Sequence, residues 1–130
     1  MTLKTLIDLE ELINDSNLIA MYVDYINNIE VYEQLKQLIA EQKDAYKLFK
    51  EILYFQKKYV DRTLSITTGL HFYDFYNPDC PENKRNYELI VRYALENYDK
   101  FEQKTIKQKQ ILDALLEIQK KVCEKWHFEP

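Results

Sequence analysis

Glycine is almost missing from this chain of 130 residues, and its scarcity excludes several kinds of structure. Gly69 is the single glycine, and only three prolines accompany it. Glycine supplies the left-handed conformations of tight turns, β-bulges and phosphate-binding loops, so many turns or a glycine-rich nucleotide loop are not expected. No apolar run approaches the length that a membrane-spanning helix needs, and no contact with a membrane is expected. Few turns predict long helices.

Cysteine is scarce as well, since Cys80 and Cys123 are the only two, and a disulfide framework is therefore not expected. The sequence does not open on a basic segment followed by an apolar stretch, so no secretory signal is expected. We therefore expect an intracellular, cytoplasmic protein. The motifs Gly-x-Ser-x-Gly and His-Glu-x-x-His are absent, and we predict no catalytic residue, no enzymatic activity and no cofactor.

The residues that are present predict one folded domain over residues 1–130. Apolar residues make up 46% of the chain and charged residues 31%, which is typical of a folded protein. Apolar periodicity predicts helices over residues 5–13, 16–26, 30–64 and 82–126. We expect an all-α fold, an antiparallel helical bundle of four to five helices, with one aromatic-rich connecting loop at about residues 66–81.

The third of these segments has the clearest pattern. Five residues recur in it every seven positions: Leu35, Gln42, Phe49, Gln56 and Thr63. Between them fall apolar pairs that make a second column: Leu38/Ile39, Ala45/Tyr46, Ile52/Leu53 and Tyr59/Val60. A seam with a second apolar column beside it predicts a helix packed inside a bundle.

The last segment contains a polar stretch, residues 102–110, whose one strong apolar residue is Ile106. It separates two apolar seams. A bend near Lys104 would fold residues 107–126 back and give a compact bundle, and we expect this fold-back because a monomer must cover both seams. In the alternative the helix is continuous, and dimerisation would be needed to bury its apolar stripe.

Charge is unevenly distributed within the net charge of −4. Residues 1–33 contain one base, Lys4, against seven acids, whereas the remainder has a small basic excess. Solvated helix faces usually have this pattern. The acidic segment has two other interpretations: it packs against the more basic remainder, or it faces a basic partner.

Aromatic residues cluster in the expected loop, and we predict that they bind a protein partner. The predicted partner-binding residues are Phe72, Tyr73, Phe75 and Tyr76. Large aromatics dominate interface hot spots, and an exposed cluster of this size is a binding patch. In the alternative, the loop plugs the open end of the bundle. The expected function is a non-enzymatic protein-binding module, namely an adaptor, an inhibitor or an assembly subunit, with a homodimer as one form.

Lysine outnumbers arginine fifteen to three. An alternative function is a nucleic-acid-associated bundle that uses the Lys/Arg face of residues 84–125. Acids interrupt this face and the net charge is negative, so nucleic acid is not the expected partner. The same composition is typical of AT-rich genomes, and it suggests a phage, viral or mobile-element origin.

Metal or small-ligand binding is a third hypothesis. The candidate ligands are His71, Cys80, Cys123 and His127, and the spacing of the last two suits one helix face. The two pairs can meet only if the last segment folds back. Isolated cysteine and histidine residues are usually packing residues, so no metal site is predicted.

Overall fold

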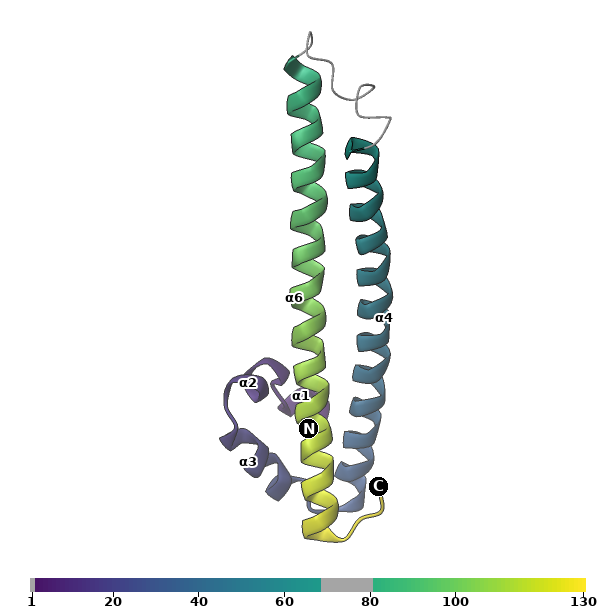
Figure 1. Ribbon diagram of the computed structural model, residues 1–130. Helices are drawn as coiled ribbons and strands as arrows, with labels where there is room; N and C mark the ends of the chain where they lie inside the picture. Colours follow the sequence, from purple (N-terminus) through teal and green to yellow (C-terminus); the bar gives the residue numbers. More distant parts are fainter. Residues whose placement is uncertain (1, 69–80) are drawn as a thin grey trace. The chain divides into compact units, whose positions relative to one another are not determined.

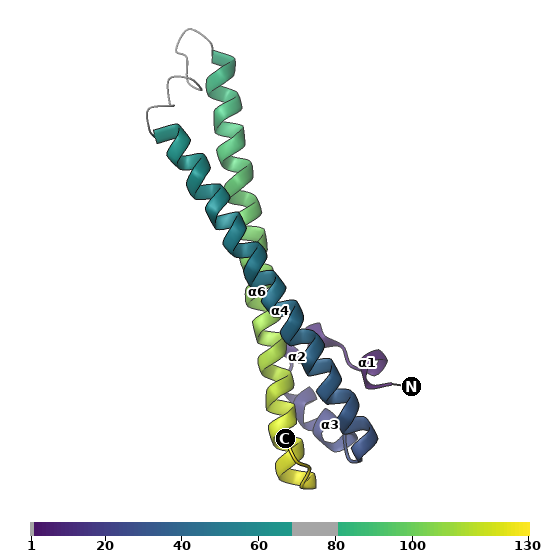
Figure 2. The same ribbon diagram turned by 90° about the vertical axis from the view of Figure 1, so that its right-hand side faces the viewer.

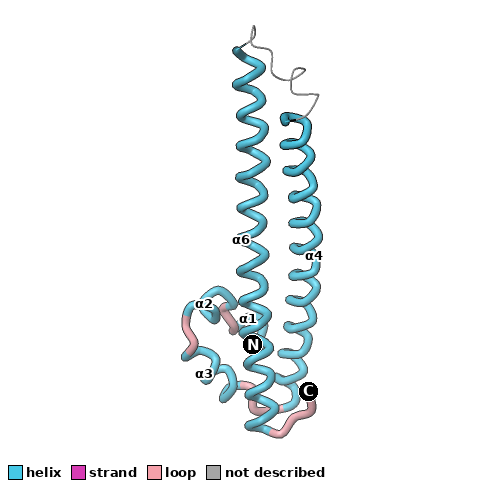
Figure 3. The backbone as a smooth tube through the Cα atoms, viewed as in Figure 1, coloured by secondary structure: helices cyan, strands magenta, loops and turns pink. Residues whose placement is uncertain are grey.

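The computed structural model describes residues 2–68 and 81–130, without the side chains of residues 65–68 and 81–87. In these residues it has five helices (Figure 1): α1 (Leu3–Leu6), α2 (Leu9–Asn14), α3 (Asn17–Tyr25), α4 (Ile29–Thr68) and α6 (Pro81–Trp126). The described chain is helix and loop without a strand (Figure 3). The predicted all-α class and antiparallel helical bundle are confirmed. None of the described helices combines enough length with enough apolarity to cross a membrane.

The chain divides into two compact units, to both of which α4 and α6 contribute. Residues 1–47 and 106–130 form the first, which we call the core unit. Residues 48–105 form the second, which we call the hairpin unit. The single domain over residues 1–130 stays a prediction.

The core unit buries one continuous hydrophobic cluster. The three short helices lie beside the start of α4 and the end of α6 (Figures 1 and 2). The cluster takes buried side chains from all five helices, among them Leu3, Leu12, Ile19, Tyr22, Val23, Leu35, Leu38, Ile39, Ile111, Leu112, Leu115, Ile118 and Val122. The α4 and α6 seams expected from the sequence are therefore buried here, and each short helix adds its apolar face to them.

The predicted first helix is wrong in one respect, because residues 5–13 do not form a single helix. The chain forms α1 and α2, with Ile7 and Asp8 between them. Asp8 is the N-cap of α2, and its carboxylate accepts hydrogen bonds from the backbone N–H groups of Glu10 and Glu11 at 3.0 and 3.1 Å. A cap of this kind satisfies N–H groups that have no partner inside the helix, which favours a new start at this point.

The other helices begin close to the expected positions. The second predicted helix is α3 (Asn17–Tyr25), and the Asp15 carboxylate accepts from the backbone N–H of Asn17 at 3.0 Å. The Asn28 side chain accepts from the backbone N–H of Val31 at 3.1 Å near the start of α4. At its other end α4 runs to Thr68, past the predicted end at Leu64, so the expected loop begins later than residue 66. Isoleucine and threonine weaken a helix by only a few tenths of a kcal/mol each, roughly, and this is too little to end one.

The expected fold-back near Lys104 is wrong, because α6 is one uninterrupted helix from Pro81 to Trp126. The polar stretch is not a bend: it places Thr105 and Gln108 among the buried side chains. The Gln108 Nε2 donates to the Gln42 Oε1 on α4 at 2.6 Å. The Thr105 hydroxyl donates to the Phe101 carbonyl at 2.7 Å. Because these polar groups have partners, a low apolar content does not mark the end of the helix.

The acidic N-terminal segment packs against lysines of α6, as one of its interpretations had it. Lys107 forms an ion pair with Glu10 at 2.8 Å, and Lys125 pairs with Asp24. These pairs are exposed, and each contributes at most about 1 kcal/mol to stability. Most of the stability of the core unit must therefore come from its apolar burial.

Candidate functional site

The described part of the hairpin unit has little buried interior. Its described elements are the last part of α4 and the first part of α6. Among its described side chains the buried ones are Val60, Ala94 and Thr105. Two helices share a single contact seam, so any further apolar stripe on either helix is left uncovered.

On α4 two mainly apolar stripes run side by side in this unit. The inner stripe is made of buried or half-buried residues: Phe49, Leu53, Gln56 and Val60. The outer stripe lies one residue earlier at each step and consists of Leu48, Ile52, Phe55 and Tyr59. Phe55 is 66% exposed, Leu48 57% and Tyr59 50%, whereas Ile52 is half-buried. The steps of four, three and four residues keep the outer stripe on one side of the helix, about 100° from the inner one.

On α6 the hairpin unit exposes further large apolar side chains. Leu89, Ile90 and Tyr93 are exposed, Tyr93 by 65%, and Leu95 is exposed as well. Leu89 and Tyr93 are four residues apart and therefore lie on the same side of the helix. Exposed apolar residues thus gather on both helices of this unit. Soluble monomers rarely expose large contiguous apolar patches, and such patches mark contact surfaces.

Aromatic rings and charges border the outer stripe. The rings of Tyr54 and Phe55 meet edge to face, with their centroids 5.7 Å apart. The Lys58 ammonium lies 4.6 Å from the centroid of the Tyr54 ring. Glu51, seven residues before Lys58, is exposed and lies on the same flank of the stripe. The stripe therefore has an acid and a base at equivalent positions along one edge.

The predicted partner-binding rings lie outside the described residues. Phe72, Tyr73, Phe75 and Tyr76 fall between Thr68, where α4 ends, and Pro81, where α6 begins. Sequence reasoning missed the outer stripe, although its signal was present: Ile52 and Tyr59 belong to the second apolar column of this segment. That column was assigned to packing inside a bundle, but among the described residues of the hairpin unit α6 is the one helix beside α4.

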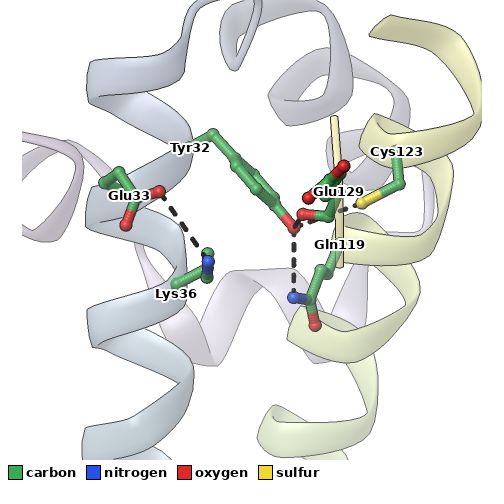
Figure 4. A network of polar contacts seen from close by, with 6 residues as sticks. All are labelled: Tyr32, Glu33, Lys36, Gln119, Cys123 and Glu129. Atoms are coloured by element: carbon green, nitrogen blue, oxygen red, sulfur yellow. Dashed lines mark hydrogen bonds and ion pairs between the residues drawn. The ribbon is translucent and has the colours of Figure 1, made fainter. Parts of the chain in front are cut away.

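Cys123, a candidate metal ligand, is instead half-buried in a polar network around Tyr32 in the core unit (Figure 4). The Tyr32 hydroxyl donates to the Glu129 carbonyl at 2.8 Å and accepts from the Gln119 Nε2 at 3.3 Å. Its oxygen lies 3.2 Å from the Cys123 Sγ. Since the one phenol proton goes to Glu129, the thiol must be the donor to Tyr32. Burial raises the pKa of Tyr32 above its ordinary value of 10.0.

The geometry does not support the expected pairing of Cys123 with His127 on one helix face. α6 ends at Trp126, and His127 adopts a φ of 61°, outside the helix. The His127 N–H donates to the Cys123 carbonyl at 3.0 Å and closes the last turn. His71 and Cys80 lie outside the described residues. In the described chain no group of three or more histidine, cysteine or acidic residues is placed to hold a metal ion.

Four lysines of residues 84–125 form ion pairs with carboxylates. Lys107 and Lys125 pair with the acidic segment, as described above. Lys109 pairs with Asp113 at 2.9 Å, and this hydrogen bond raises the pKa of Lys109. Lys121 pairs with Glu117 at 3.1 Å. Phosphate binding at these four lysines would have to displace their carboxylates.

A pocket of about 330 Å³ lies in the core unit between α2, α3 and α6. Leu12 and Ile19 contribute apolar surface, and Asp113 and Glu117 contribute carboxylates. Both carboxylates already have the lysine partners named above. Ligand sites usually combine an apolar lining with a few convergent polar groups, and the other polar residues of this lining are Ser16 and Gln110.

Comparisons with protein-family models, with curated proteins and with solved structures find no match for this chain. In the described chain, the exposed outer stripe is the feature that most needs an explanation.

Proposed function

We propose that this chain is a non-enzymatic protein-binding module that binds through the outer stripe of α4. The observation that carries the proposal is the exposure of Leu48, Phe55 and Tyr59 on one side of a helix whose other apolar side already packs. Covering these side chains removes apolar surface from water, which contributes roughly 25 cal/mol for each Å². The rings of Phe55 and Tyr59 are also of the type that anchors protein interfaces.

Roles as an adaptor, an inhibitor or an assembly subunit all agree with such a surface. The half-buried Cys123 thiol already contacts Tyr32, and Lys109 already pairs with Asp113, so neither side chain is proposed as a catalytic group. The ring cluster of Phe72, Tyr73, Phe75 and Tyr76 remains a second proposed contact. Replacing these four residues by alanine is expected to abolish partner binding and to leave the helical circular dichroism unchanged. Loss of the helical signal would instead favour the alternative in which the loop plugs the open end of the bundle.

A photo-cross-linking residue tests the outer stripe. Phe55→benzoylphenylalanine places the reactive ketone in the stripe, and Lys57→benzoylphenylalanine is the matched control on the opposite side of α4. We expect irradiation in the producing cells to yield one protein adduct of defined mass from position 55 and none from position 57. Equal adducts from both positions, or none from position 55 in a protein of unchanged helicity, would contradict the proposal.

A further inference from the structure

The outer stripe has the spacing of a coiled-coil seam. If Leu48 and Phe55 are assigned to heptad position d, Ile52 and Tyr59 take position a. Glu51 and Lys58 then both take position g, at the solvent edge of the seam. Both are exposed, and they have opposite charge.

An antiparallel pair of such helices brings the g edge of one helix along the g edge of the other. With a two-fold axis between Ile52 and Phe55, Leu48 of each copy lies beside Tyr59 of the other. Glu51 of each copy then faces Lys58 of the other copy, so the two ion pairs form together. A parallel pair would place Glu51 opposite Gln56 and would form neither ion pair. The edge charges therefore favour an antiparallel partner with the same sequence.

The charge of the hairpin unit also permits two copies to meet. Residues 48–105 contain nine basic and nine acidic residues, so this unit has no net charge. The whole net charge of −4 lies in residues 1–47 and 106–130. Two hairpin units therefore approach each other without net repulsion.

We propose that the chain forms a two-fold symmetric dimer in which the outer stripe of α4 packs antiparallel against the outer stripe of a second copy. Glu51 and Lys58 pair across this interface at both ends of the stripe. This inference rests on the proposed function and names its partner: a second copy of the chain covers Leu48, Ile52, Phe55 and Tyr59. Lys58 has the reach for this role, because its ammonium already lies over the Tyr54 ring on the edge of the stripe.

Charge reversal tests the dimer without a change in apolar content. Glu51→Lys presents two lysines to each other at both ends, and Lys58→Glu presents two glutamates. We expect each variant alone to dimerise at least about tenfold more weakly than the natural chain, measured by sedimentation at low salt. A 1:1 mixture of the two variants should form a heterodimer of nearly the original affinity, and so should the double variant as a homodimer.

The mixture separates loss of pairing from loss of folding, because a variant that is misfolded cannot rescue its counterpart. Lys57→Glu is the matched control: it reverses a charge on the opposite side of α4 and should leave the dimer unchanged. A natural chain that remains monomeric at all concentrations would overturn the inference. A dimer that does not respond to Glu51→Lys, Lys58→Glu or Phe55→Ser would also overturn it.

The outcome of the dimerisation test is distinguishable from the outcome of the cross-linking test of the proposed function. If the natural chain is monomeric while the cross-linker at position 55 captures a different protein, the dimer is wrong and the protein-binding surface remains. If the chain is monomeric and position 55 gives no adduct, both proposals are wrong. An adduct with the mass of two chains, together with the charge rescue, supports both.

Discussion

Gln108 donates to Gln42 at 2.6 Å across the contact between α6 and α4 in the core unit. Gln108 is buried and Gln42 is half-buried, so each amide depends on the other for its hydrogen bond. Gln108 Nε2 also lies 3.4 Å from the Gln42 carbonyl. The pair forms a polar layer, and on α6 it directly precedes the apolar seam made by Ile111, Leu115 and Ile118.

This layer predicts a non-additive double-mutant cycle. Gln108→Leu alone leaves the Gln42 amide without its partner and should destabilise the protein by about 1–3 kcal/mol. Gln42→Leu with Gln108→Leu replaces both amides by apolar groups of similar size, and the double variant should be close to the natural chain in stability. Urea unfolding of the four proteins measures the cycle. Additive losses would show that the two amides do not act as a pair.

The raised pKa of Tyr32 predicts that the free energy of unfolding depends on pH in the alkaline range. Tyr32→Phe removes the bonds to Glu129 and Gln119 and should lower the free energy of unfolding by about 1–2 kcal/mol at neutral pH. The pKa of Tyr32 is raised in the folded protein, so its contribution is fully present below the unfolded pKa of 10.0 and is lost as the pH rises through the folded pKa. The difference between the two proteins should therefore shrink as the pH rises above about 10. A constant difference over this range would show that Tyr32 does not titrate as proposed.

His127 predicts opposite effects of two substitutions at the end of α6. Its φ of 61° is a conformation that glycine adopts without strain and that a β-branched residue resists. His127→Gly should be neutral or stabilise the core unit by up to about 1 kcal/mol, whereas His127→Val should destabilise it by about 1–2 kcal/mol. Thermal unfolding monitored by circular dichroism compares the two. A valine variant as stable as the glycine variant would show that the left-handed turn does not persist in solution.

Leu115 and Phe55 are matched probes of the two units. Leu115 is fully buried, and Leu115→Ala should destabilise the protein by about 2–5 kcal/mol. Phe55 is mostly exposed in one chain, and Phe55→Ala should change the stability of the monomer by no more than about 0.5 kcal/mol. At concentrations where the dimer forms, Phe55→Ala should be more destabilising, and this added loss should rise with protein concentration. A loss from Phe55→Ala that is independent of concentration would place Phe55 in the interior of a single chain.

The helices could be predicted from the sequence because their signals are local. Seam residues such as Leu35 and Leu115 recur at helical spacing, and they are buried as expected. The break at Asp8 was missed because one capping carboxylate, unmarked by glycine or proline, decides it. The continuity of α6 was missed because residues 102–110 look like a turn until Gln108 is seen beside Gln42. Periodicity locates an apolar face but does not say whether a neighbour covers it, and so the outer stripe was not recognised.

The core unit is assembled from two segments that lie far apart in the sequence, and this sets the order in which the chain can fold during synthesis. The unit joins residues 1–47 to residues 106–130, so Leu35 and Leu38 lack their partners on α6 until Ile111 and Leu115 have left the ribosome. The intervening 58 residues of the hairpin unit form a loop whose closure costs entropy before the core contacts compensate for it. Nascent chains halted before residue 106 should therefore expose the apolar faces of α1, α2 and α3, and chaperones that hold unfolded chains have their targets there.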